Sequence, residues 1–111
     1  MKLVYIAGPY RGKTVIHTII NIIRAWRVGY QIINRCPGWF PVIPHMNTAL
    51  MDWAASDEYF LEGTMDLMRE CVAVYRMKRW TRSRGGVLEV REARFLDMPI
   101  YDSIDEIVAD S

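Results

Sequence analysis

The sequence has little of what marks the specialised classes of protein. Only two of its 111 residues are cysteines, and Cys36 and Cys71 belong to no metal-like or redox-like motif. We expect both thiols to be reduced and buried, as is usual in a cytoplasmic protein. No apolar run approaches the roughly 20 residues of a membrane-spanning helix, so we expect no membrane partner. The opening MKLVYIAG is typical of a first strand rather than of a signal peptide.

An excess of charge of one sign is also absent. The chain has 14 Lys and Arg against 13 Asp and Glu, a net charge of +1, whereas binding to a nucleic-acid backbone needs many cations. The basic stretch Lys78–Arg84 contains Trp80 and permits a nucleic-acid interpretation. The near-neutral total instead favours a solvated loop over an anionic small ligand. Because of this near-neutral charge we expect no nucleic-acid partner. No His, Cys or Asp cluster has metal-ligand spacing, so we also expect no metal or other cofactor.

What is present is the composition of a globular protein. Hydrophobic residues make up 51% of the chain and charged residues 24%, with no low-complexity tract or internal repeat. A chain of this length is enough for one domain with a single core. We therefore expect one domain over residues 1–111.

Apolar runs of strand length alternate with helical patterns along the chain. We expect strands at Lys2–Ala7, Trp39–Pro44, Val72–Met77 and Met98–Asp102, and helices that begin at Thr14, run from near Phe60 to Cys71, and cover Leu88–Leu96 and Ser103–Asp110. The segment from His45 to Asp57 is expected to be a loop. This alternation predicts an α/β fold, a small doubly wound parallel sheet of flavodoxin or Rossmann type, with strand order 2-1-3-4 and helices on both faces.

The first helix shows a clear apolar stripe, and Thr14 is a plausible N-cap. The stripe consists of Ile16, Ile19, Ile20, Ile23 and Trp26. Thr18, Asn21 and Arg24 are expected to face away from it. An amphipathic helix normally turns such a stripe toward the core.

The stretch AGPYRGKT, Ala7–Thr14, fits the loose form of a phosphate-binding loop. Such loops bind phosphates through successive backbone N–H groups, and Pro9 has none. The enzyme class also needs an Asp at the end of another strand to hold Mg²⁺, but the strand VAVYRM ends in Arg76 and Met77. A kinase-like function is therefore our third and least favoured hypothesis, which the absence of Mg²⁺-dependent ATP binding would exclude. A strand, glycine-rich turn and helix remain, and such a unit can still bind an anion.

The unusual residues gather at one edge of the predicted sheet. The loops Gly8–Gly12 and Trp80–Gly86 follow strands one and three, whose carboxyl ends border the crevice in this fold. His45 follows strand two at the same edge. A lone His is more often structural than catalytic, and we interpret Asn47 and Asp52 in the same way. Asp57 is expected to cap the second helix.

Four segments together resemble the nucleoside 2-deoxyribosyltransferase-like superfamily. They are YIAGPYRG, FPVIPHMNTA, LMRECVAVYRM and WTRSRGGVLEVREA, which cover about the full length in the same order of elements. The greatest similarity is to a small phage and bacterial branch. The superfamily includes 2′-deoxynucleoside 5′-monophosphate N-glycosidases. The resemblance implies a small-molecule nucleoside or nucleotide as substrate and a homo-oligomer, a dimer or larger, with sites near subunit boundaries.

The resemblance also implies roles for individual residues. Glu89, spaced after Ser83 and Gly85 as in the family motif, would be the nucleophile at the sugar C1′, and we expect it to be ionised near a helix N-terminus. A serine at the Ser83 position is typical of members that accept a 5′-phosphate. The phosphate would be bound by that serine and by the first loop, and the remaining substrate-binding candidates are Gly8, Tyr10, Arg11, Gly12, Gly85, His45 and, as a wall of the site, Tyr5.

Two departures from the family pattern leave a second hypothesis open. Thr64 stands where the family usually has an Asp that handles the sugar hydroxyl or the base, and Val72 stands where it often has another Asp. The first hypothesis is an N-glycosidase or deoxyribosyltransferase acting on a (deoxy)nucleoside or its 5′-monophosphate. The second is a catalytically inactive nucleotide-binding module of the same fold. Whether another carboxylate, such as Asp57 or Asp66, reaches the site distinguishes them.

Overall fold

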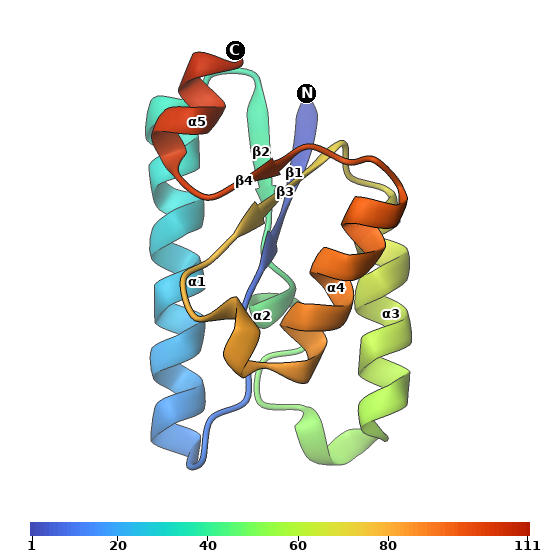
Figure 1. Cartoon of the computed structure of the whole chain (residues 1–111). Helices are drawn as coiled ribbons and strands as arrows, with labels where there is room; N and C mark the ends of the chain where they lie inside the picture. Colours follow the sequence, from blue (N-terminus) through green and yellow to red (C-terminus); the bar gives the residue numbers. More distant parts are fainter.

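A computed structural model describes residues 1–111 and contains one four-stranded, all-parallel sheet (Figure 1). The strands lie in the order β2-β1-β3-β4, which confirms the predicted topology. Their bounds are β1 Lys2–Ala7, β2 Trp39–Val42, β3 Ala73–Arg76 and β4 Ile100–Tyr101. The central strand β1 is apolar and mostly buried, as expected for a strand covered on both faces. The edge strand β2 carries a proline, Pro41, paired in register with Val4.

Helices cover both faces of the sheet. Their bounds are α1 Val15–Arg35, α2 Pro44–Asn47, α3 Asp57–Arg69, α4 Arg84–Phe95 and α5 Ile104–Ala109, with short 3₁₀ turns η1 Asp52–Ala54 and η2 Trp80–Arg82. Figure 1 shows α1 and α5 on one side of the sheet and α3 and α4 on the other. None of these helices has both the length and the apolar character needed to cross a membrane.

Side-chain caps fix where four of the helices begin. Thr14 caps α1 as predicted, and Ser83 and Ser103 cap α4 and α5. The predicted Asp57 cap is wrong, because Ser56 accepts the N–H of Tyr59 and Asp57 is already helical. The segment expected to be a loop also folds locally, into α2 and η1.

Two buried clusters form the core, one on each face of the sheet. The larger cluster lies between the sheet and the helices α1 and α5 and includes Val4, Ile6 and Ile32. The smaller one lies under α3 and α4 and includes Tyr5 and Val74. Cys36 and Cys71 are buried free thiols, one in each cluster, as the sequence predicted.

The face that α1 turns toward the sheet is not the predicted one. Its buried residues are Thr18, Ala25, Gly29 and Ile32, whereas the isoleucines of the predicted stripe and Trp26 are exposed. The close approach of α1 to the segment after β2 explains why this face, and not the apolar stripe, is buried. A Cβ on Gly29 would lie 2.5 Å from Ile43 Cδ1, so this side of α1 packs too tightly for larger side chains.

Candidate functional site

A cleft of about 350 Å³ opens beyond the carboxyl ends of the strands, where open α/β sheets bind their ligands. It draws on the loop after β1, on α2, η1 and α3, and on the start of α4. Its walls are formed by Gly8, Tyr10, Arg11, Pro44, His45, Thr48, Asp52, Asp57, Phe60, Leu61, Thr64, Arg82, Ser83, Arg84, Gly85, Gly86 and Glu89. A cleft of this size accommodates a small molecule.

Most of the predicted site residues meet in this cleft, and two do not line it. Gly8, Tyr10, Arg11, His45, Ser83, Gly85 and Glu89 line it together. Tyr5 lies fully buried and reaches the site only through its hydroxyl group. Gly12 donates its N–H to Thr18 Oγ1 at 2.9 Å, inside the α1 N-terminal turn, and so offers no donor to the cleft.

Glu89 is a nearly buried carboxyl group. Only 6% of the residue is exposed, and the Tyr5 hydroxyl donates a short hydrogen bond to its Oε2. Burial raises the Glu89 pKa to about 7, although hydrogen bonding from Tyr5 and Thr64 opposes the rise. Near neutral pH the carboxyl group is therefore divided between its protonated and ionised forms.

The prediction that Glu89 lies at a helix N-terminus, and is kept ionised by it, is wrong. The helix was predicted to begin at Leu88, which would have placed Glu89 in its first turn. Ser83 caps α4 instead, so Glu89 is the sixth residue of the helix. The effect of the helix dipole fades beyond the first turn, and desolvation decides the pKa.

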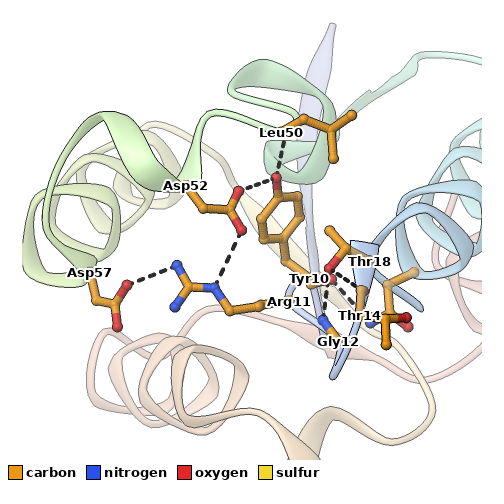
Figure 2. Close-up of polar contacts among 9 residues, drawn as sticks. Tyr10, Arg11, Gly12, Thr14, Thr18, Leu50, Asp52 and Asp57 are labelled. Atoms are coloured by element: carbon orange, nitrogen blue, oxygen red, sulfur yellow. Dashed lines mark hydrogen bonds and ion pairs between the residues drawn. The ribbon is translucent and has the colours of Figure 1, made fainter. Parts of the chain in front are cut away.

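Tyr10 and Arg11 organise the mouth of the cleft (Figure 2). The Tyr10 hydroxyl donates to Asp52 Oδ1 at 2.7 Å and accepts the Leu50 N–H at 2.7 Å. The Arg11 guanidinium lies 3.3 Å from Asp52 Oδ2 and 2.9 Å from Asp57 Oδ1. The cation predicted to bind phosphate is therefore already paired with two carboxylates. A phosphate could bind Arg11 only in competition with them.

His45 is a neutral, structural residue at the back of the cleft. It is 3% exposed, and its Nε2 lies 3.1 Å from the Pro9 carbonyl oxygen. Because a carbonyl oxygen only accepts, Nε2 carries the proton, and the buried Nδ1 is an acceptor without a protein partner. Burial lowers the His45 pKa to about 4. His45 thus anchors the loop after β1 through its bond to Pro9.

The start of α4 supplies donors to the same cleft. Ser83 Oγ accepts the Gly86 N–H at 3.1 Å, which leaves the Ser83 hydroxyl proton available. The Gly85 N–H lies in the first turn, where a helix has no internal partner for it. A Cβ at Gly86 would lie 2.8 Å from the Trp80 carbonyl oxygen, so a side chain there would push α4 away from η2.

No second carboxylate lies within hydrogen-bond reach of Glu89, and this arrangement favours the nucleotide-binding module of the two hypotheses from the sequence. Asp57 does line the cleft, but its carboxylate is bonded to Arg11 rather than to Glu89. Asp66 lies outside the cleft and pairs with Arg69 at 2.9 Å. The group from α3 that faces Glu89 is the Thr64 hydroxyl, whose single proton can be donated either to Glu89 or to the Leu61 carbonyl oxygen, which lies 3.1 Å away. No Asp or Glu side chain hydrogen-bonds to Glu89.

Phe60 and Leu61 are cleft residues that were not predicted from the sequence. They face the ligand space together with Asp57 and Thr64, and the spacing of three, four and seven residues is that of one helix face. This spacing is present in the sequence, but other apolar residues of the same helix have a similar spacing, so the sequence does not show which face of the helix lines the cleft. No group of three or more His, Cys, Asp or Glu side chains is arranged to hold a metal ion.

The sequence matches no protein-family model and no curated protein. The functional assignment therefore depends on the resemblance of the four sequence segments and on the residues and geometry of the cleft.

Proposed function

We propose that the chain is an N-glycosidase or deoxyribosyltransferase-type enzyme that cleaves or exchanges the base of a (deoxy)nucleoside or its 5′-monophosphate. The observation that carries the proposal is the Glu89 carboxyl group, held by Tyr5 at the edge of a small-molecule cleft. A buried carboxyl group with a raised pKa in a cleft is a typical catalytic arrangement. The family resemblance of the sequence supplies the reaction type.

In this proposal, ionised Glu89 is the nucleophile. An oxygen of Glu89 forms a bond to the sugar C1′ while the C1′–N bond breaks. The bonding electron pair leaves with the base, which takes up a proton from water. Water then hydrolyses the glycosyl ester, or a second base displaces the carboxylate. The Tyr5 hydroxyl occupies Oε2 and orients the carboxyl group, so Oε1 is the attacking oxygen.

A 5′-phosphate would bind at the start of α4. The Ser83 hydroxyl, the Gly85 N–H and the side chains of Arg82 and Arg84 are all at the cleft. A helix N-terminus attracts anions through its free N–H groups and its dipole, and arginine suits the geometry of phosphate. This part of the cleft is a better phosphate site than Arg11, which Asp52 and Asp57 neutralise, because Arg82 makes no ion pair and Arg84 has only a long one, 3.9 Å from Glu58.

The test is release of free base from a panel of deoxynucleosides and their 5′-monophosphates. We expect Glu89→Gln to lower the rate by at least about 10³-fold, since it removes the nucleophile but keeps the shape of the side chain. Glu92→Gln is the matched control, because Glu92 lies one turn on in α4 and pairs with Arg69 at 2.7 Å. Equal rates in the wild type and Glu89→Gln would refute the proposal.

The Glu89 pKa also predicts the pH dependence. The nucleophile must be ionised, and half of it is protonated near pH 7. We therefore expect kcat/KM to rise with pH through about 7 and then to level off. Activity that falls as pH rises over the same range would assign Glu89 to proton donation instead.

The second candidate function is a nucleotide-binding module without turnover. The observation that favours it is Thr64, a hydroxyl residue facing Glu89 where a second carboxylate would assist the reaction. Binding of a nucleoside monophosphate, detected as a rise in Tm, together with no base release from any substrate, would establish this function. In that case Ser83→Ala should reduce the Tm shift, and Glu89→Gln should not.

A further inference from the structure

The outer face of α1 carries a continuous row of large apolar side chains. The row, here called the outer stripe, consists of Ile16, Ile19, Ile23, Trp26, Tyr30 and Ile33, which are 69%, 39%, 50%, 48%, 56% and 63% exposed. None of these residues belongs to either core cluster. The sheet packs against a different arc of the helix, formed by Thr18, Ala25, Gly29 and Ile32.

The spacing of the outer stripe is that of a helix–helix seam. Its residues follow one another at intervals of three, four, three, four and three along α1. This is the a and d pattern of a coiled coil, in which each side chain enters a gap on a facing helix. A stripe this narrow is typical of a seam between two helices rather than of a broad surface.

The exposed area of the stripe approaches that of one side of a standard protein interface. With ordinary side-chain areas of about 150 to 250 Å², its exposed fractions correspond to roughly 600 Å² of apolar surface. A patch of this size is at the upper end for a monomer, and a standard interface buries about 800 Å² on each partner. The neighbouring side chains of Val15 and Ile20 are also exposed and extend the patch toward that area.

We propose that a second copy of this chain docks on the outer stripe, with the two α1 helices packed antiparallel about a twofold axis. The stripe is symmetric about its middle. An antiparallel partner therefore places Ile16 opposite Ile33, Ile19 opposite Tyr30, and Ile23 opposite Trp26. Two of these three layers then set an aliphatic side chain against an aromatic one, which fills a helix interface better than like against like. A twofold interface uses the same patch on both copies.

Local packing supports self-association. The outer stripe contains no charged side chain, because the arginines of α1 (Arg24, Arg27 and Arg35) lie outside it, so a partner of the same apolar character can cover it. Trp26 and Tyr30 already stack on one another, with ring centroids 5.4 Å apart. The two rings thus present one pre-ordered surface, which lowers the entropy lost on docking. This proposal does not depend on the function assigned to the cleft.

Mass measurement in solution tests the proposal. We expect the wild type to be a dimer at micromolar concentration by light scattering or sedimentation. Trp26→Glu and Ile23→Glu should weaken the dimer at least about 100-fold, because each buries a charge in an apolar seam. The matched control is Phe95→Glu on α4, since Phe95 is an exposed apolar residue on the opposite side of the sheet. The control should remain dimeric, and circular dichroism should confirm that all variants fold.

Crosslinking tests the direction of packing. Ile16→Cys mixed with Ile33→Cys should form a disulfide between the two variants, and neither variant alone should form one at that position. A wild type that stays monomeric at high micromolar concentration would overturn the proposal. So would a dimer that Phe95→Glu disrupts as strongly as Trp26→Glu. Association of monomers with vesicles of anionic lipid, lost in Trp26→Glu, would assign the stripe to a membrane surface instead.

Discussion

At the cleft, Glu89 and His45 are almost completely removed from solvent, while along the outer stripe of α1 Ile16 and Trp26 remain about half or more exposed. A folded chain normally does the opposite in both places, because burying ionisable groups and exposing large apolar ones each cost free energy. The cleft lies beyond the carboxyl ends of the strands, and the outer stripe lies on the helix α1, on the side that faces away from the sheet. Such departures from the usual distribution of side chains are where we expect a protein to meet its ligands and partners.

The buried groups of the cleft act on stability with opposite signs. The Glu89 pKa is raised to about 7, so its contribution to stability is present below pH 4.5 and is lost as pH rises through 7. The His45 pKa is lowered to about 4, so neutral His45 contributes above pH 6.5, and that contribution is lost as pH falls through 4. The isoleucines and Trp26 of the outer stripe carry no titratable group. Titration therefore separates the two regions experimentally.

The largest effect should come from removing the charge at the cleft. Glu89→Gln keeps the hydrogen-bonding shape but cannot ionise, so it escapes the cost of a buried carboxylate at high pH. We expect the free energy of unfolding of the variant, relative to wild type, to increase by about 3 kcal/mol between pH 4.5 and pH 8. Urea denaturation at a series of pH values measures this difference. A difference that stays constant with pH would mean that Glu89 is not buried in solution.

A smaller effect is expected at the mouth of the cleft. Tyr10→Phe removes the hydroxyl that bonds Asp52 and the Leu50 N–H, and should lower the free energy of unfolding by about 1 to 2 kcal/mol. Tyr59→Phe is the matched control, since Tyr59 is exposed and its hydroxyl makes no hydrogen bond within the chain. Equal losses in the two variants would show that the bonds of Tyr10 contribute nothing in solution.

The smallest effect on the free energy of unfolding should come from a substitution in the outer stripe of α1. Ile16→Gln replaces a mostly exposed side chain, so within a monomer it should change the free energy of unfolding by less than about 0.5 kcal/mol. The free energy of unfolding should be compared between Trp26→Glu and the double variant Trp26→Glu, Ile16→Gln, because both are expected to be monomers, in which association does not add to stability. A loss of several kcal/mol there would mean that Ile16 packs within its own chain.

The order of the sheet was predictable because apolar runs and helical periods alternate plainly along the chain. The orientation of α1 was not. Periodicity identifies residues that share a face, such as Ile16 and Ile23, but not what that face meets. The sheet packed against the small side chains of Ala25 and Gly29, which allow close approach, and left the larger ones outside.

The candidate site was predictable in its location and less so in its chemistry. Strand ends and loops brought Gly8, Ser83 and Glu89 to one cleft as expected. The pairing of Arg11 with two aspartates and the raised Glu89 pKa depend on burial and on contacts between distant segments. Neither can be read from local sequence. We expected a fully ionised Glu89 in the first turn of a helix, whereas its burial divides it between the protonated and ionised forms near pH 7.

Pro41, in the edge strand β2, limits how copies of this molecule can meet. An unpaired strand edge is a template on which further strands can add, and this leads to continuous sheets and fibrils. Proline has no N–H to donate to an incoming strand, so it interrupts such growth. The opposite edge, β4, is only two residues long. Both ends of the sheet are thus poor starting points for aggregation, and ordered contact between copies is left to the helices.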